Sequence, residues 1–79
     1  LTTNMSITVK GTVERRDIGM GAWALVGEDG KTYEIMRGAD KSLLQQGQKA
    51  EVTGDVREDV MSAAMIGPML EVKSFDIKN

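Results

Sequence analysis

The strongest constraint on the fold is a pair of alternating apolar and polar stretches joined by Asp29-Gly30. Glycine tolerates the positive φ that a tight turn between two strands requires. Trp23 and Tyr33 each share one strand face with an aliphatic residue two positions further on, because side chains alternate along a strand. The sequence therefore predicts a β-hairpin whose strands cover residues 22–26 and 31–36.

Three further stretches have the period of a β-strand. Residues 5–13 and 48–56 alternate cleanly, and each carries a glycine on its apolar face, Gly11 and Gly54. Glycine at such a position indicates a bend, a bulge or a close approach of another backbone. A last strand is expected at 70–77, where the apolar residues change phase and a bulge near Ser74 would restore the alternation.

A short helix is expected between the third and fourth strands. Asp40 can accept hydrogen bonds from unpaired backbone N–H groups at a helix start, and residues 41–46 are good helix formers. Gly47 stands where a glycine ends a helix. Two turns are too short to be stable alone, so Leu43 and Leu44 would attach this element to the sheet.

The chain of 79 residues is long enough for one domain, which we expect to span residues 5–77. Its core should contain the apolar residues that share these strand faces and one leucine of the helix. The expected core residues are Ile7, Val9, Val13, Trp23, Leu25, Tyr33, Ile35, Leu44, Val52, Val56, Leu70 and Val72.

The order of three strands, a short helix and two strands resembles the OB-fold. The resemblance covers almost the whole chain and includes the two Val-x-Gly-x-Val strands and the third strand Gly-Lys-Thr-Tyr-Glu-Ile. It implies an all-β, five-stranded Greek-key barrel with one short helix, and in many members such a barrel binds oligonucleotides or oligosaccharides. The pattern is similar to that of small nucleic-acid-binding OB domains and of small bacterial OB-like proteins of unassigned function.

Composition argues against catalysis. The chain has no histidine and no cysteine, so it lacks the commonest general base near neutral pH and the thiol nucleophile. Glu58 and Asp59 are adjacent, and adjacent side chains of a strand point to opposite faces, so this pair reads as a solvated loop. We therefore expect a protein that is not an enzyme, with no catalytic residues and no cofactor.

The compartment depends on where the native chain begins. If it begins at Met5, residues 1–4 are a disordered or cloning-derived tail and we expect a cytoplasmic protein. If Leu1 follows a cleaved leader, the protein is periplasmic or secreted. No apolar run approaches the ~20 residues of a membrane-spanning helix, so no contact with a membrane is expected.

An uncharged apolar segment at residues 60–69 provides the leading functional prediction. It is longer than a tight hairpin needs, and methionine is common where a surface meets a partner. Such a segment either closes the end of the barrel or contacts a protein partner or a second copy of the chain. The candidate contact residues are Met20, Val60, Met61, Met65 and Ile66.

Single-stranded nucleic-acid binding is the alternative. Arginines and lysines flank the loops that would border an OB binding face, but the net charge is −2 and acidic residues neighbour most of them. Ordinary surface charge is the competing interpretation, and the alternation places the aromatic side chains in the core. The candidates are Arg15, Arg16, Lys31, Arg37 and Arg57.

Copper(I) binding is a third and weaker interpretation. Met61, Met65 and Met69 are four residues apart, and thioethers are soft ligands that suit Cu(I). Some small periplasmic OB-fold proteins bind Cu(I) with methionines and a tryptophan, but they also use a histidine, which this chain lacks. Pro68 prevents a regular helix from reaching Met69. We therefore expect no metal site.

Overall fold

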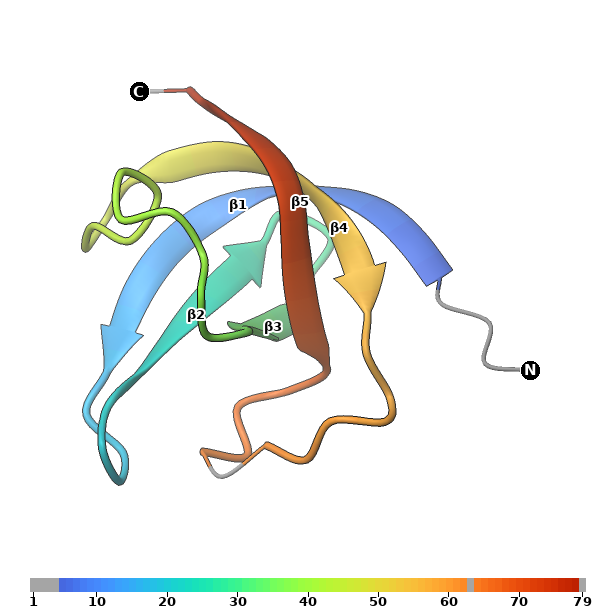
Figure 1. Cartoon of the computed structure of the whole chain (residues 1–79). Helices are drawn as coiled ribbons and strands as arrows, with labels where there is room; N and C mark the ends of the chain where they lie inside the picture. Colours follow the sequence, from blue (N-terminus) through green and yellow to red (C-terminus); the bar gives the residue numbers. More distant parts are fainter. Residues whose placement is uncertain (1–4, 63, 79) are drawn as a thin grey trace.

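The computed structural model describes residues 5–62 and 64–78 (Figure 1). The prediction of a disordered tail at 1–4 lies outside these residues. Across the described residues the protein is all-β, as predicted. The strands are β1 (Met5–Arg16), β2 (Ala22–Gly27), β3 (Thr32–Ile35), β4 (Lys49–Val56) and β5 (Met69–Ile77).

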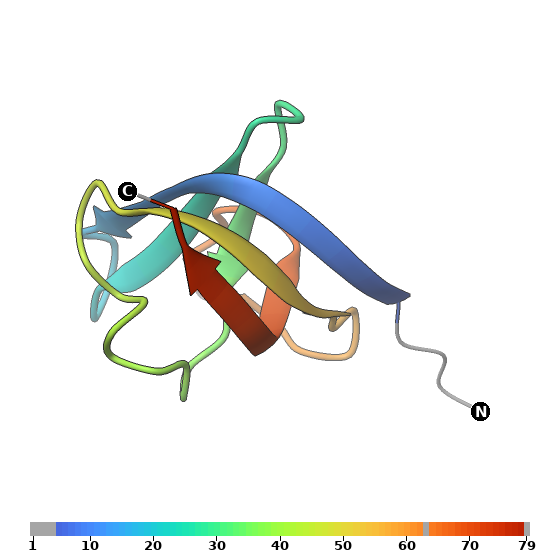
Figure 2. The same ribbon diagram turned by 90° about the horizontal axis from the view of Figure 1, so that it is seen from above.

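The strands form one sheet that closes into a barrel in the order β1-β2-β3-β5-β4. The long strand β1 curves around the barrel and pairs antiparallel with both of its neighbours (Figure 2). Its residues 5–12 pair with β4, and its residues 11–16 pair with β2. A short parallel pairing of β3 with β5 closes the barrel.

The predicted irregularity in the last strand is present. Thr53 pairs with Ser74 but Gly54 pairs with Val72, so Lys73 has no partner across the ladder. The extra residue reverses the alternation of β5, because side chains alternate with a period of two. Val72 and Phe75 therefore both pack against the core although they are three positions apart.

The central hairpin turns where the sequence predicts. Gly30 has a φ of +86°, and the Gly27 amide donates a hydrogen bond to the Lys31 carbonyl at 2.8 Å. The Asp29 carboxylate accepts a hydrogen bond of 2.9 Å from the Lys31 amide. Burial and the nearby Asp29 carboxylate raise the pKa of Tyr33. The turn is thus stabilised from both the backbone and a side chain.

The core contains every residue that the alternation predicts. Val9, Val13, Leu25, Tyr33, Ile35, Val52 and Leu70 are buried, while Ile7, Trp23, Leu44, Val56 and Val72 are partly buried and pack against them. Four buried apolar residues were missing from the predicted core: Leu43, which is fully buried, and Ala24, Ala50 and Met69.

The predicted helix at 40–46 is wrong. The segment forms successive turns in which the Leu43 amide bonds to the Asp40 carbonyl at 3.0 Å and the Leu44 amide to the Lys41 carbonyl at 3.1 Å. Asp40 does use its carboxylate as expected: it accepts the amide of Ser42, two residues on, at 2.8 Å, which is the bond of a helix N-cap. The turns do not continue into a helix because seven residues cannot offset the cost of helix nucleation.

The long connection still does the packing that was expected of a helix. Leu43 lies in the core, and the Gln48 side-chain amide donates hydrogen bonds to the carbonyls of Ser42 and Leu43 at 2.7 and 2.9 Å. The Gly47 amide donates to the Val13 carbonyl at 2.8 Å. The segment is therefore fixed to β1 without helical structure.

Candidate functional site

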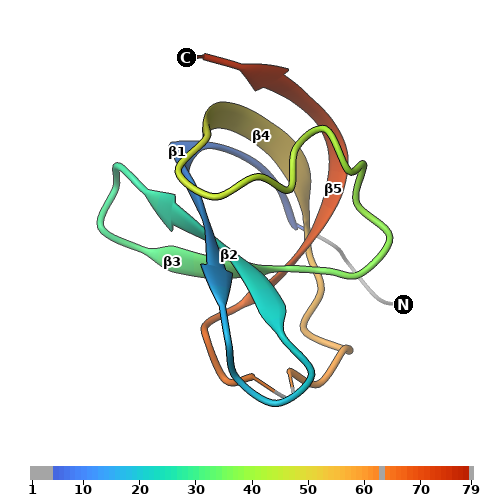
Figure 3. The ribbon, with the colours of Figure 1, turned by 90° about the vertical axis from the view of Figure 1, so that its left-hand side faces the viewer.

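A cleft of about 640 Å³ opens at one end of the barrel. The connections between β1 and β2 and between β4 and β5 lie together at this end (Figure 3). Both line the cleft, with the ends of β2 and β3 and part of the 36–48 connection. The lining side chains include Arg15, Ile18, Met20, Trp23, Glu34, Met36, Arg37, Leu44, Val60, Met61, Ala64 and Met69.

Large apolar side chains stand exposed on both sides of this cleft. Met20 and Met61 are 86% and 94% exposed, and Ile18 is about half exposed. We call these three residues the methionine rim. They come from two connections that are distant in sequence, so the fold alone brings them to one opening.

Of the remaining predicted contact residues, one lines the cleft and two lie outside it. Val60 lines the cleft and is partly buried. Met65 is 87% exposed but does not line the cleft, and Ile66 is partly buried outside it. The 60–69 segment thus has one end in the cleft wall and a tip that points elsewhere.

Trp23 lies between the core and the cleft. It packs against the core cluster, and the Arg15 guanidinium lies 5.5 Å from the centre of its ring. Arg15 and Trp23 face each other across the β1–β2 ladder. Gly21 has a φ of +90°, a backbone conformation that favours glycine. The Arg15 guanidinium also lies where a Cβ at Gly21 would stand, but its side chain is 45% exposed and its flexible end can move aside.

The β4–β5 connection is fastened to the outer face of β3. Glu34 is only 8% exposed, and the Ser62 hydroxyl donates a hydrogen bond to its carboxylate. The same hydroxyl oxygen accepts the Met65 amide at 2.8 Å, and the Glu34 amide donates to the Pro68 carbonyl at 2.9 Å. These hydrogen bonds attach the connection to β3 at both its middle and its end.

Sequence reasoning missed Glu34 and Ser62. Alternation places Glu34 on the face opposite Tyr33, which reads as solvent-exposed in an isolated hairpin. The one sequence feature that hinted at this contact was Ser62, a hydrogen-bonding residue within an otherwise apolar connection. Nothing in the local pattern indicates which strand that connection covers.

The cationic candidates do not form one patch. Arg15 and Arg37 line the cleft, whereas Lys31 lies next to the β2–β3 turn and does not. Arg16 bonds to Glu14 at 3.1 Å. The expected group of five is therefore brought together only in part.

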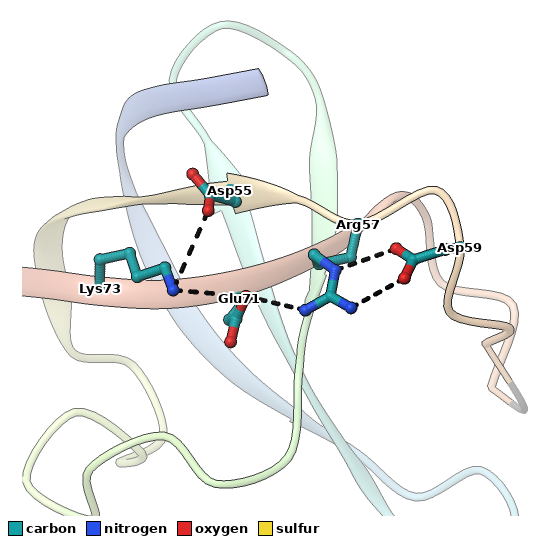
Figure 4. A network of polar contacts seen from close by, with 5 residues as sticks. All are labelled: Asp55, Arg57, Asp59, Glu71 and Lys73. Carbon is teal, nitrogen blue, oxygen red and sulfur yellow. Dashed lines mark hydrogen bonds and ion pairs between the residues drawn. The ribbon is translucent and has the colours of Figure 1, made fainter. Parts of the chain in front are cut away.

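Arg57 is occupied by a network that joins the ends of β4 and β5 (Figure 4). Its guanidinium bonds to Asp59 at 2.8 Å and to Glu71 at 2.9 Å, and Lys73 lies 3.5 Å from Glu71 and 4.0 Å from Asp55. Hydrogen bonds from Arg57 lower the pKa values of Asp59 and Glu71, and the two carboxylates raise that of Arg57. We assign Arg57 to the structure of the barrel.

The described residues contain no cluster of three or more acidic, histidine or cysteine side chains placed to hold a metal ion. The three evenly spaced methionines are not brought together as a set: Met61 and Met69 both line the cleft, the first exposed and the second buried in β5, whereas Met65 is exposed outside it. Nor does that part of the chain form a helix long and apolar enough to cross a membrane.

Comparison with known proteins gives no further constraint. The chain matches no protein-family model, no curated protein and no solved structure. The arrangement of its own side chains is thus the basis for a functional interpretation.

Proposed function

We propose that this protein is a non-catalytic binding module that contacts a protein partner through the cleft and its methionine rim. The observation that carries the proposal is the exposure of Met20 and Met61 on opposite connections of one opening. Exposed apolar side chains around a concave site are typical of protein-interaction surfaces, and methionine adapts its shape to varied partners.

One wall of the site is attached to the sheet before a partner binds. The hydrogen bonds from Ser62 to Glu34 and from the Glu34 amide to the Pro68 carbonyl hold the β4–β5 connection against β3. A site that is ordered before binding loses less conformational entropy when the partner arrives.

A peptide library displayed on phage tests the proposal. We expect peptides enriched on the wild-type protein to lose binding to the double variant Met20→Lys/Met61→Lys, because two buried charges would replace apolar contacts. Met65→Lys is the matched control, since Met65 is as exposed but lies outside the cleft. Failure to enrich peptides, or equal binding to the double variant, would reject the site.

Self-association is a form of the same proposal. Sedimentation velocity over a hundredfold range of protein concentration separates it from binding to another protein. A dimer that the double variant abolishes would identify a second copy as the partner. A monomer at every concentration would leave a different protein as the partner.

Binding of single-stranded nucleic acid is the second candidate. We propose it for a barrel of the OB type, supported by the strand order and by the Arg15–Trp23 pair at the cleft. Two observations weigh against it: Arg15 covers a face of Trp23, and the guanidinium of Arg57 is held by two carboxylates. Titration with oligothymidine at low and high salt tests it, because phosphate contacts weaken steeply as salt rises.

A further inference from the structure

The charge inside the cleft differs in sign from that of the whole chain. Three charged side chains line it, Arg15, Arg37 and Glu34, whereas the chain carries a net charge of −2. Glu34 is buried and accepts the Ser62 hydroxyl, and its single negative charge offsets only one of the two arginines. A ligand entering the cleft therefore meets two guanidinium groups among apolar side chains.

The four arginines are not equally engaged. Arg57 bonds to two carboxylates and Arg16 to one. Arg15 has only a 3.7 Å contact with Asp17, whose side chain is 91% exposed. Within residues 5–62 and 64–78, Arg37 makes no ion pair. The two least neutralised arginines are thus the two that line the cleft.

Arg15 is also placed beside an aromatic ring. Its guanidinium lies 5.5 Å from the centre of the Trp23 ring, and its side chain is 45% exposed. A ligand in the cleft can therefore reach this guanidinium, which binds a carboxylate through two parallel hydrogen bonds.

We infer that the ligand of this cleft is a peptide segment in which apolar side chains alternate with carboxylates. The carboxylates pair with Arg37 and Arg15, and the apolar side chains pack against the methionine rim. This inference rests on the proposed function and names the chemistry of the partner. A peptide fits better than a nucleic acid because Arg15 occupies a Trp23 face that a stacked base would need.

Trp23 is the single tryptophan of the chain and lines the cleft, so its fluorescence reports on occupancy. The full chain is titrated with an eight-residue peptide of alternating leucine and glutamate, with the same peptide carrying glutamine for glutamate, and with an eight-nucleotide oligothymidine. At low salt we expect the glutamate peptide to bind about a hundredfold more tightly than the glutamine peptide, because the change removes two charged hydrogen-bonded pairs worth about tenfold each.

Arg37→Gln should reduce the affinity for the glutamate peptide about tenfold and leave the affinity for the glutamine peptide unchanged. Lys31→Gln is the matched control, because it removes one positive charge outside the cleft. A circular dichroism spectrum and a urea unfolding curve for each variant show that the barrel is intact.

Equal affinity for the two peptides, no response of Trp23 to either, or tighter binding of oligothymidine would overturn the inference. Equal affinity that is lost in Met20→Lys/Met61→Lys would refute the acidic specificity and leave the proposed function standing. Failure of the proposed function is detected separately, by the library selection on the same protein.

Discussion

Backbone proximity at Gly54 leaves no room for a side chain. A Cβ at this position would lie 2.9 Å from the carbonyl carbon of Glu71, in the strand that pairs with it. We expect Gly54→Ala to destabilise the barrel by about 1–3 kcal/mol, as in other overpacked cores, because β4 and β5 must move apart. Urea unfolding followed by circular dichroism measures this loss.

Gly30→Ala is the comparison for Gly54→Ala. Nothing lies within 4 Å of a Cβ at Gly30, but its φ is +86°. Only the backbone strain remains, and it costs about 1–2 kcal/mol in the left-handed region. If Gly54→Ala is neutral while Gly30→Ala destabilises, the close approach of β4 and β5 is incorrect.

The solvent exposure of the methionine side chains should set the order in which they are oxidised. Hydrogen peroxide should oxidise Met20, Met61 and Met65 to sulfoxides well before Met69, which is 8% exposed. Peptide mapping by mass spectrometry over a time course measures the order. In concentrated urea the four should react at similar rates, which controls for sequence effects. Early oxidation of Met69 in the folded protein would contradict its burial in β5.

The strands could be predicted because each carries its own local signal. The alternation around Gly11 locates β1, and the phase change near Ser74 locates the bulge. The 40–46 segment could not, since its composition and its Asp40 cap suit a helix while its length supports only separate turns. Its path is set by contacts with distant residues, such as the hydrogen bond from the Gly47 amide to the Val13 carbonyl.

One hydroxyl makes two of the hydrogen bonds that attach the β4–β5 connection. Ser62→Ala would remove the hydrogen bond to the buried Glu34 carboxylate and the acceptor of the Met65 amide. We expect a loss of about 1–3 kcal/mol, because a buried acceptor loses its partner. Hydrogen exchange of the Met65 amide should accelerate at the same time.

Ser74→Ala serves as the control for Ser62→Ala, because Ser74 is exposed on β5. It should change neither the stability nor the exchange of Met65 by a comparable amount. Unchanged exchange at Met65 in Ser62→Ala would show that the hydroxyl does not hold the connection.

At the scale of the whole molecule, the sequence named candidate residues but not their arrangement. Met20 and Met61 were predicted as contact residues, and the structure places both at one cleft. The Arg15–Trp23 pair and the burial of Glu34 depend on which strands meet and which face is covered. Those are properties of the closed barrel, and no local pattern contains them.

Acid should weaken the barrel through the carboxylates whose pKa values are lowered in the folded state. Hydrogen bonds from Arg57 lower the pKa of Asp59 below 3.8 and that of Glu71 below 4.5, their ordinary values. A carboxyl group whose pKa is lower in the folded than in the unfolded protein stabilises the fold at any pH above its unfolded-state pKa. That contribution is lost as the pH falls through the pKa of the folded state. The Arg57 network therefore stabilises the barrel at neutral pH and ceases to do so toward pH 2.

The variant Arg57→Gln isolates this contribution. Urea unfolding between pH 7 and pH 2 should show the wild type more stable than the variant at neutral pH, with the difference shrinking below about pH 4. Lys31→Gln removes the same charge from a side chain that makes no ion pair in the described part of the chain, so its effect should not follow that titration. A difference for Arg57→Gln that persists undiminished at pH 2 would mean that Arg57 acts by packing, and that its two carboxylates contribute nothing to the joining of β4 and β5.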